Sequence, residues 1–133
     1  GSIDVNGDVD LYDIQLTKLP LKFGFVGGDF DCSYNNLTTL EGGPRQVGGD
    51  FNCQGNQLTI LDGCPREVGG GFYCNNNKLT TLEGGPRQVG GYFNCSYNKV
   101  NKIYILFPLS FDKDFGLYGN MDKKHYFVLR VQL

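Results

Sequence analysis

The most reactive side chains in this chain are its five cysteines, four of which recur at a fixed spacing of 21 residues. A thiol can act as a nucleophile, a redox centre or a metal ligand. Zinc sites usually contain a short-spaced pair such as C-x2-C, and the sequence has none. Cysteine is also one of the residues most often buried in cores. We therefore predict a column of reduced, buried thiols and a cytoplasmic location from Cys32, Cys53, Cys74 and Cys95.

Carboxylates are concentrated in the first half of the chain, where they suggest cation binding. The segment 4–10 (DVNGDVD) is similar to the start of a calcium loop, whose alternating acids supply oxygen ligands. A complete loop needs Gly at its sixth position and an acid at its twelfth, and this chain has Val9 and Gln15 there. We therefore expect no specific metal site and no cofactor. A nonspecific divalent cation is an alternative for Asp8, Asp10, Asp29, Asp31 and Asp50.

Catalytic constellations are weak in this sequence. The single histidine, His125, follows the repetitive part of the chain, and no motif brings a nucleophile, a base and an orienting group together. Paired carboxylates on a flat sheet would lack a pocket to raise one of their pKa values. We therefore expect that the chain is not an enzyme.

The residues discussed above must be positioned by a repeat. Residues 26–46, 47–67 and 68–88 are nearly identical, a fourth copy begins at Val89, and a degenerate copy begins at Val5. A fixed period of 21 residues predicts a stacked solenoid. One coil buries too few apolar side chains to offset the entropy of ordering its backbone. Neighbouring coils must therefore share a core, and the two ends need caps.

Within one coil, the residue pattern predicts a strand followed by a turn. Phe30 and Cys32 alternate with Asp31 and Ser33, as expected for a strand with one buried face. Adjacent coils would then pair as a parallel sheet. The Gly- and Pro-rich segment that closes each coil disfavours a helix, so we expect extended, polyproline-like or short 3-10 backs. A structural, hydrogen-bonding role is predicted for Asn35, Asn56, Asn77 and Asn98.

The coil pattern F-x-C-x-x-N-x-L-x-x-L, which recurs four times in register, resembles the leucine-rich repeat pattern L-x-L-x-x-N/C-x-L-x-x-L. It is most similar to the short repeats of bacterial effectors and to Gly-Gly-rich repeat proteins of bacteriophages and large DNA viruses. Two features depart from the family. Val26 and its counterparts lie four residues before the strand's first apolar residue, where the family has three, so the strand entry is remodelled. The ubiquitin-ligase domain of the effectors also has no room in 133 residues.

The resemblance and the residue pattern together predict the architecture. We expect a leucine-rich repeat solenoid that is β-rich, with a parallel sheet on its concave face, irregular, 3-10 or extended convex backs, and a C-terminal cap. Residues 1–4 would be a tag remnant or N-terminal extension, 5–107 the solenoid of about five coils, and 108–133 the cap. No apolar stretch is long enough to cross a membrane, and the formal net charge of −2 disfavours general nucleic-acid binding.

Outward positions of the predicted sheet are the candidate functional surface. Acids dominate the first coils and lysines the last, while tyrosines, which are favoured at recognition surfaces, occur at both ends. We expect this face to bind a partner protein. The resemblance implies a phage factor that acts on a bacterial host protein in the host cytoplasm. The candidate contact residues are Tyr12, Asp29, Asp31, Tyr34, Asp50, Tyr73, Lys78, Tyr92, Tyr97 and Lys99.

Two alternatives are open at this stage. The chain could be a structural protein that stacks on copies of itself through its last coil or its C-terminal strand. It could instead bind an anion or a nucleic acid through a ladder of arginines on the convex side. A parallel ladder of acids, Glu41, Asp62 and Glu83, would offset the charge of Arg45, Arg66 and Arg87.

Overall fold

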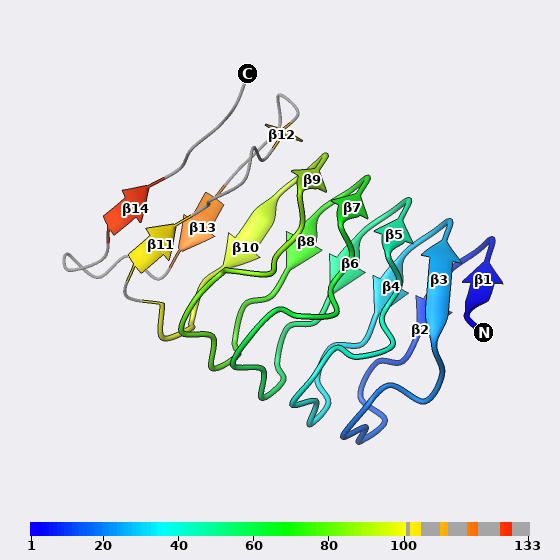
Figure 1. The fold of residues 1–133 in the computed structure, drawn as a ribbon. Helices are drawn as coiled ribbons and strands as arrows, with labels where there is room; N and C mark the ends of the chain where they lie inside the picture. Colours follow the sequence, from blue (N-terminus) through cyan, green and yellow to red (C-terminus); the bar gives the residue numbers. More distant parts are fainter. Residues whose placement is uncertain (101, 105–109, 112–116, 120–125, 129–133) are drawn as a thin grey trace.

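The computed structural model describes residues 1–100, 102–104, 110–111, 117–119 and 126–128, with side chains for residues 1–100. These residues form a parallel β-solenoid, and no helix occurs among them. Figure 1 shows the coils stacked one behind another, so that each coil lies directly against the next. The solenoid predicted from the repeat period is therefore confirmed.

Each coil contributes one strand to each of two parallel sheets, and both sheets have six strands. Sheet A contains, in spatial order, β1 (Ile3–Val5), β3 (Phe23–Val26), β5 (Gln46–Val47), β7 (Glu67–Val68), β9 (Gln88–Val89) and β12 (Ser110–Phe111). Sheet B contains β2 (Val9–Asp10), β4 (Phe30–Asp31), β6 (Phe51–Asn52), β8 (Phe72–Tyr73), β10 (Phe93–Cys95) and β13 (Leu117–Gly119). A third, two-stranded sheet pairs β11 (Lys102–Tyr104) with β14 (Tyr126–Val128).

The sequence period equals one turn of the solenoid. In sheet B, Phe51 pairs with Phe30 on one side and with Phe72 on the other. In sheet A, Val47 pairs with Val26 and Val68 in the same way. Equivalent residues therefore form straight columns through the stack, and a residue is in contact with its counterparts 21 positions away.

The second sheet was not expected. The sequence predicted one parallel sheet with extended or 3-10 backs. The described backs contain no 3-10 turn, and the last two residues of a back form a strand of sheet A, as in Gln46–Val47, Glu67–Val68 and Gln88–Val89. The physical reason lies at the corner between the two sheets, which is the Gly-Gly pair after each Val. With no side chains at the corner, the coils approach closely enough for both flanking segments to pair.

Close packing makes the corner glycines obligatory. A Cβ atom on Gly48 would lie 2.2 Å from the carbonyl oxygen of Gly27 in the preceding coil, and one on Gly69 would lie 2.2 Å from that of Gly48. Real Cβ atoms essentially never come within 3.0 Å of such a backbone atom. The repeated Gly-Gly pairs are therefore explained by the stacking of backbone on backbone.

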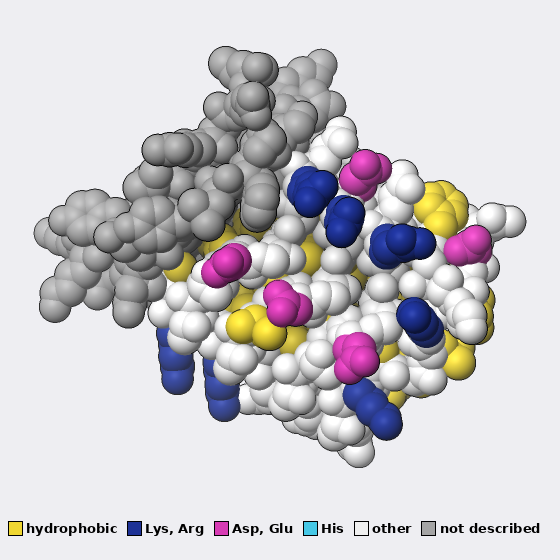
Figure 2. Space-filling model, in the orientation of Figure 1, with side chains coloured by type: hydrophobic (Ala, Val, Ile, Leu, Met, Phe, Trp, Pro, Cys, Tyr) yellow, Lys and Arg dark blue, Asp and Glu magenta, His cyan; other side chains and the backbone are white. Residues whose placement is uncertain are grey.

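The arginine ladder lies at the outer side of sheet A. Arg45, Arg66 and Arg87 directly precede β5, β7 and β9 and are exposed. Their backbones are linked between coils, since the Arg66 N–H donates to the Arg45 carbonyl at 2.9 Å and the Arg87 N–H to the Arg66 carbonyl at 2.7 Å. Figure 2 shows basic side chains in a row over these strands, with acidic side chains in a second row on the same face.

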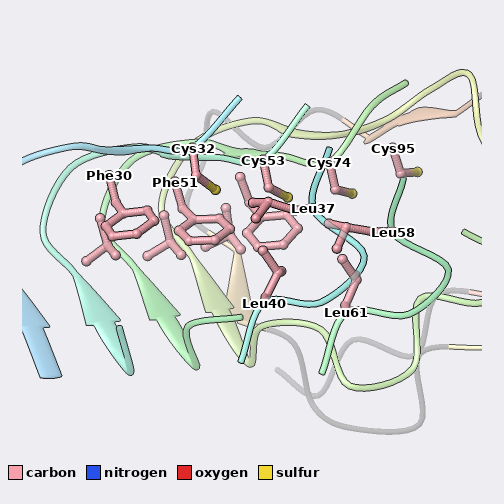
Figure 3. Packing of buried hydrophobic residues seen from close by; sticks show 14 of the residues in the cluster. Phe30, Cys32, Leu37, Leu40, Phe51, Cys53, Leu58, Leu61, Cys74 and Cys95 are labelled. Carbon is pink, nitrogen blue, oxygen red and sulfur yellow. The ribbon is translucent and has the colours of Figure 1, made fainter. Parts of the chain in front are cut away.

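The core is a set of apolar columns between the two sheets and the turns. The rings of Phe30, Phe51 and Phe72 are stacked with centroids 5.4–5.5 Å apart. Leucines from the turn fill the space opposite the rings, and the thiols form a separate row (Figure 3). The predicted buried cysteine column is confirmed: the sulfurs are reduced, and the residues are 0–3% exposed.

Both ends of the predicted solenoid continue into the flanking segments. At the start, β1 begins at Ile3, within the predicted extension 1–4, and pairs with β3. At the other end, β12 and β13 lie within the predicted cap 108–133 and add the last strand to sheets A and B. The alternation of apolar residues from Tyr126 to Leu133 predicts a strand in the tail. Of this strand, Tyr126–Val128 is present as β14, and residues 129–133 lie outside the described residues.

Candidate binding surface

Each described turn after sheet B has a left-handed backbone at one shared repeat position, and the first turn has a second left-handed residue, Gln15. The angle φ is 55° at Tyr34, 56° at Asn76 and 54° at Tyr97. Gly, Asn and Asp adopt this conformation readily, whereas a tyrosine there is strained. Two coils therefore place a tyrosine where the backbone disfavours it. We call this position the turn column: Asp13, Tyr34, Gly55, Asn76 and Tyr97.

The predicted asparagine column holds this turn in place. The side chain of Asn56 accepts a hydrogen bond from the Leu37 N–H of the preceding coil at 2.9 Å. Its amide nitrogen donates to the carbonyls of Cys32 and Cys53 at 3.0 and 3.1 Å. Asn35, Asn77 and Asn98 repeat this arrangement. The structural role predicted for the column is confirmed.

Tyr34 combines the strained backbone with an exposed ring. Its side chain is 48% exposed, and the ring covers the backbone of Gly55 in the next coil, where a Cβ atom would lie 2.7 Å from Cδ1. Tyr12 lies on its other side, with ring centroids 5.7 Å apart in an edge-to-face contact. Tyr12 and Tyr34, which the sequence predicted as contact residues, therefore form one exposed aromatic pair.

Tyr97 occupies the turn column one coil after Asn76 and two coils after Gly55. It lies near the end of the described stack that is opposite to Asp13. It is 68% exposed, which is the largest exposure among the described large apolar and aromatic side chains that lie on the surface. Lys99 follows it by two residues, and Lys78 takes the position equivalent to Lys99 in the preceding coil. Both lysines are exposed. The predicted contacts Tyr97, Lys78 and Lys99 therefore lie at one end of this surface.

Tyr73 and Tyr92 lie at the corner of the later coils. The ring of Tyr73 lies over Gly71, where a Cβ atom would be 2.7 Å from the phenol oxygen. Partial burial, and then the nearby Asp50 carboxylate and Tyr92, raise the pKa of Tyr73. Tyr92 is 48% exposed. The structure therefore brings Asp50, Tyr73 and Tyr92 together, and the glycine at 71 is explained by the tyrosine two residues later.

The corner aspartates have a role that the sequence did not reveal. The Asp8 carboxylate accepts the Asp29 N–H at 2.7 Å, Asp29 accepts the Asp50 N–H at 2.8 Å, and Asp50 accepts the Gly71 N–H at 2.7 Å. Each acid thus satisfies one backbone donor of the next coil. Asp29 and Asp50, predicted only as orienting charges, also link neighbouring coils. A side chain that faces a backbone group 21 residues away gives no local sequence signal.

Asp31 begins an Asx turn. Its carboxylate accepts hydrogen bonds from the N–H and the hydroxyl of Ser33. Asp10, Asn52 and Asn94 form the equivalent bond to the residue two positions later. Tyr73 takes this position in its coil and supplies no such acceptor. Asn75, two residues later, is buried, and its Oδ1 has no hydrogen-bond partner within residues 1–100. The side chain of Asn75 instead donates to Gln54 at 2.8 Å.

The acidic end does not gather its carboxylates into a metal centre. Within the described residues, no group of three or more His, Cys, Asp or Glu side chains is arranged to hold a metal ion. The aspartates are spread along two separate ladders, and one oxygen of each is bonded to a backbone N–H. The cation site considered for Asp8, Asp10, Asp29, Asp31 and Asp50 is therefore not supported.

The thiols are poor nucleophiles. Burial, and next the Asp31 carboxylate, raises the pKa of Cys32 to about 12. Burial raises that of Cys95 to about 11, and those of Cys53 and Cys74 well above the usual value. Cys64 is half-buried in the back of its coil, where burial and Asp62 raise its pKa to about 12. All five thiols are therefore protonated at neutral pH. His125 lies outside the described residues.

The predicted contact residues thus fall into three groups along the outside of sheet B and its turns. Tyr12, Tyr34 and Asp31 lie at the first coils, Asp50, Tyr73 and Tyr92 at the central and later corners, and Lys78, Tyr97 and Lys99 at the later turns. Asp29 belongs to the corner ladder between the first two groups.

Comparisons with known proteins add no assignment, because no family model matches the chain, and no curated protein or solved structure shows a significant similarity to it. Among the described residues, none forms a helix that could span a membrane.

Proposed function

We propose that this chain is a non-catalytic binding module that presents the outside of sheet B and the turn column to a partner protein. The observation that supports it most is the pair Tyr34 and Tyr97, which are exposed residues in a left-handed conformation. Other coils have Gly55 or Asn76 at the same turn position, and these residues adopt the left-handed backbone at a lower conformational free energy. A strained tyrosine that gains little burial is better explained by what it contacts outside the chain.

The finer identity of the repeat and of the partner belongs to the same proposal. We infer that the coil is a variant of the short leucine-rich repeat, because its F-x-C-x-x-N-x-L-x-x-L pattern resembles that family. By the same resemblance, the partner would be a bacterial host protein that a phage-encoded factor meets in the host cytoplasm. The Gly-Gly corner and the second sheet are two features in which this coil differs from the short leucine-rich repeat pattern.

The test exchanges tyrosines for residues that other coils already carry at the same positions. Tyr34→Asn and Tyr97→Asn copy Asn76, and Tyr73→Asn copies Asn52 and Asn94. Wild type and this triple variant, each shown to be folded by circular dichroism, would be used as bait in bacterial lysate. We expect one stoichiometric partner that wild type retains and the triple variant loses, and that rebinds wild type after purification.

A matched control addresses the arginine ladder. Arg45→Gln with Arg66→Gln removes two exposed charges from the outer side of sheet A and leaves sheet B unchanged. This control should retain the partner. Recovery of the same partner by the tyrosine variant, together with its loss from the arginine variant, would overturn the proposal and move the binding site to the arginine ladder.

A second candidate function, self-association, is favoured by the first coil. Ile3, Ile14 and Leu21 are 44–53% exposed, and Val5 and Val9 are only partly buried, whereas their counterparts Val26 and Phe30 are fully buried. Stacking of another copy on this end would cover them. Sedimentation analysis over a range of concentrations tests this: a mass that stays monomeric excludes it, and a dimer that Ile14→Asn abolishes supports it.

A further inference from the structure

The two ends of the binding surface carry opposite charge. In the column that starts the Asx turn, Asp10 and Asp31 occupy the first two coils, and neutral residues follow in the next three. In the column after the structural asparagine, neutral residues come first, and Lys78 and Lys99 occupy the later coils. The tyrosines of the turn column therefore lie in two different fields, with Tyr34 near acids and Tyr97 near lysines.

The acidic end combines aromatic rings with held carboxylates. Tyr12 and Tyr34 are about half exposed, and their rings are in edge-to-face contact at 5.7 Å. The Asp10 carboxylate is fixed by the Tyr12 N–H at 3.0 Å, and the Asp31 carboxylate by the Ser33 N–H at 2.9 Å. Asp13 follows Tyr12 in the turn column. We call this set, Tyr12, Tyr34, Asp10, Asp13 and Asp31, the acidic tyrosine surface.

No salt bridge joins these three carboxylates to a Lys or Arg side chain within residues 1–100. Their negative charge is therefore not neutralised by that part of the chain. They do not converge on a metal site either. What would complement this surface is a positive group that can lie on an aromatic face and donate to a carboxylate at the same time.

A guanidinium group has this chemistry. It is planar, stacks on tyrosine rings, and donates paired hydrogen bonds to a carboxylate. A lysine ammonium is a strongly hydrated point charge without a planar face, so it would use the carboxylates but gain less from the rings. The exposed ring pair with its adjacent carboxylates therefore favours arginine over lysine.

We propose that the acidic tyrosine surface binds an arginine-containing segment of the partner protein. This inference rests on the proposed function and specifies the chemistry at one end of the same surface. The later end, with Tyr97, Lys78 and Lys99, has the opposite charge and does not bind such a segment. The charge difference thus fixes the direction in which the partner lies along the solenoid.

The test titrates the full chain into a fluorescein-labelled peptide of alternating Gly and Arg, and fluorescence anisotropy measures the binding. The double variant Tyr12→Ser with Tyr34→Asn takes its residues from Ser33 and Asn76 at the same repeat positions. It should raise the Kd for the peptide about tenfold, as expected for the loss of two cation–π contacts. Tyr97→Asn, which makes the same exchange beside the lysines, should leave the Kd unchanged.

Charge and shape are separated by two further measurements. Asp31→Asn, which copies Asn52, keeps the acceptor of the Asx turn and removes the charge, so the peptide should bind more weakly and with a smaller salt dependence. A peptide of alternating Gly and Lys should bind several-fold more weakly than its arginine counterpart.

Three outcomes would overturn the inference: no measurable binding of the arginine peptide, equal affinities for the arginine and lysine peptides, or equal losses from the Tyr12/Tyr34 and Tyr97 variants. The proposed function is tested separately, by the lysate experiment. If the lysate partner still depends on the tyrosines while the arginine peptide fails to bind, the binding surface is retained and only its assigned chemistry is wrong.

Discussion

The Gly-Gly corner and the left-handed turn are two places in each coil where an ordinary side chain is disfavoured, and the reasons differ. At the corner, the backbone of the preceding coil occupies the space that a Cβ atom on Gly48 would need. At the turn, the space around Tyr34 and Tyr97 is open on one side, and only the sign of φ is unfavourable. The first restriction can be relieved only by moving two coils apart. The second costs of order 1 kcal/mol.

This difference explains how strictly each position repeats. The corner pair is Gly-Gly in all the coils from Gly27 onward, because stacking excludes anything larger. The turn column holds four residue types in five coils. Positions where a Cβ atom would enter the backbone of the neighbouring coil are therefore fixed by stability, and positions with open space for a side chain are available for function.

Alkaline pH should produce the largest effect, because it acts on all the stacked thiols together. Below pH 9, the thiols are neutral in both the folded and the unfolded chain, so the free energy of unfolding does not depend on their titration. Above pH 9, the unfolded chain ionises, while the raised pKa values of about 11 to 12 keep Cys32, Cys64 and Cys95 neutral in the fold. The free energy of unfolding should then fall by about 1.4 kcal/mol per pH unit for each thiol.

Urea unfolding at pH 7, 9 and 10 measures this loss. The variant Cys64→Gly, which carries the residue of Gly43 and Gly85, removes one thiol and should show a proportionally shallower decline. Unchanged unfolding midpoints between pH 7 and 10 would contradict the burial of the column.

Gly48→Ala should destabilise the chain by about 3 kcal/mol or more, because its Cβ would lie 2.2 Å from the Gly27 carbonyl oxygen and would force two coils apart. Gly7→Ala is the control: this corner glycine of the first coil has nothing within 4 Å of its Cβ position and should unfold like wild type. Urea titration of both variants measures the difference. Equal stabilities would mean that the corner is not set by stacking.

Asn56→Ala should cost about 2 kcal/mol, because it leaves the buried Leu37 N–H without a partner and removes one of the two hydrogen bonds that the Cys32 carbonyl accepts. Asn36→Ala removes an exposed side chain of the same type and should change stability little. Hydrogen exchange at the Leu37 amide gives a local measurement, and faster exchange is expected in the Asn56 variant alone. Loss of equal size in both variants would contradict the role of the asparagine column.

Tyr34→Asn should have the smallest effect, with the free energy of unfolding within about 1 kcal/mol of wild type. Relief of the left-handed strain offsets the contacts that the ring makes with Gly55 and Tyr12. Thermal and urea unfolding measure it. A loss comparable to that of Gly48→Ala would show that the turn column is a stability position after all.

Much of the interior could be predicted from the sequence. The alternation of Phe30 and Cys32 with polar residues indicated a strand, and the 21-residue period indicated parallel stacking. The asparagine column was also identified, because its distance from the strand is constant. The second sheet was missed, because a two-residue strand such as Gln46–Val47 beside Gly-Gly has no periodicity that marks it as a strand.

The outer surface was predicted only in part. Tyrosines, acids and lysines at outward positions were found from alternation, and the structure places most of them on the outside of sheet B or its turns. The acceptor bonds of Asp29 and Asp50 were not foreseen, because their donors lie in the next coil. The contact of Tyr73 with Gly71 was also not foreseen, because it depends on which way the ring turns.

Local patterns repeated along the chain specify the period, the strand that follows each corner and the residue types that form each column. Which columns touch, and how the outward residues are used, depends on how the coils pack against one another. Tyr34 meets Tyr12 and Gly55 because stacking sets residues that are 21 or 22 positions apart side by side. Such contacts arise from the offset between coils, which no segment of the chain encodes alone.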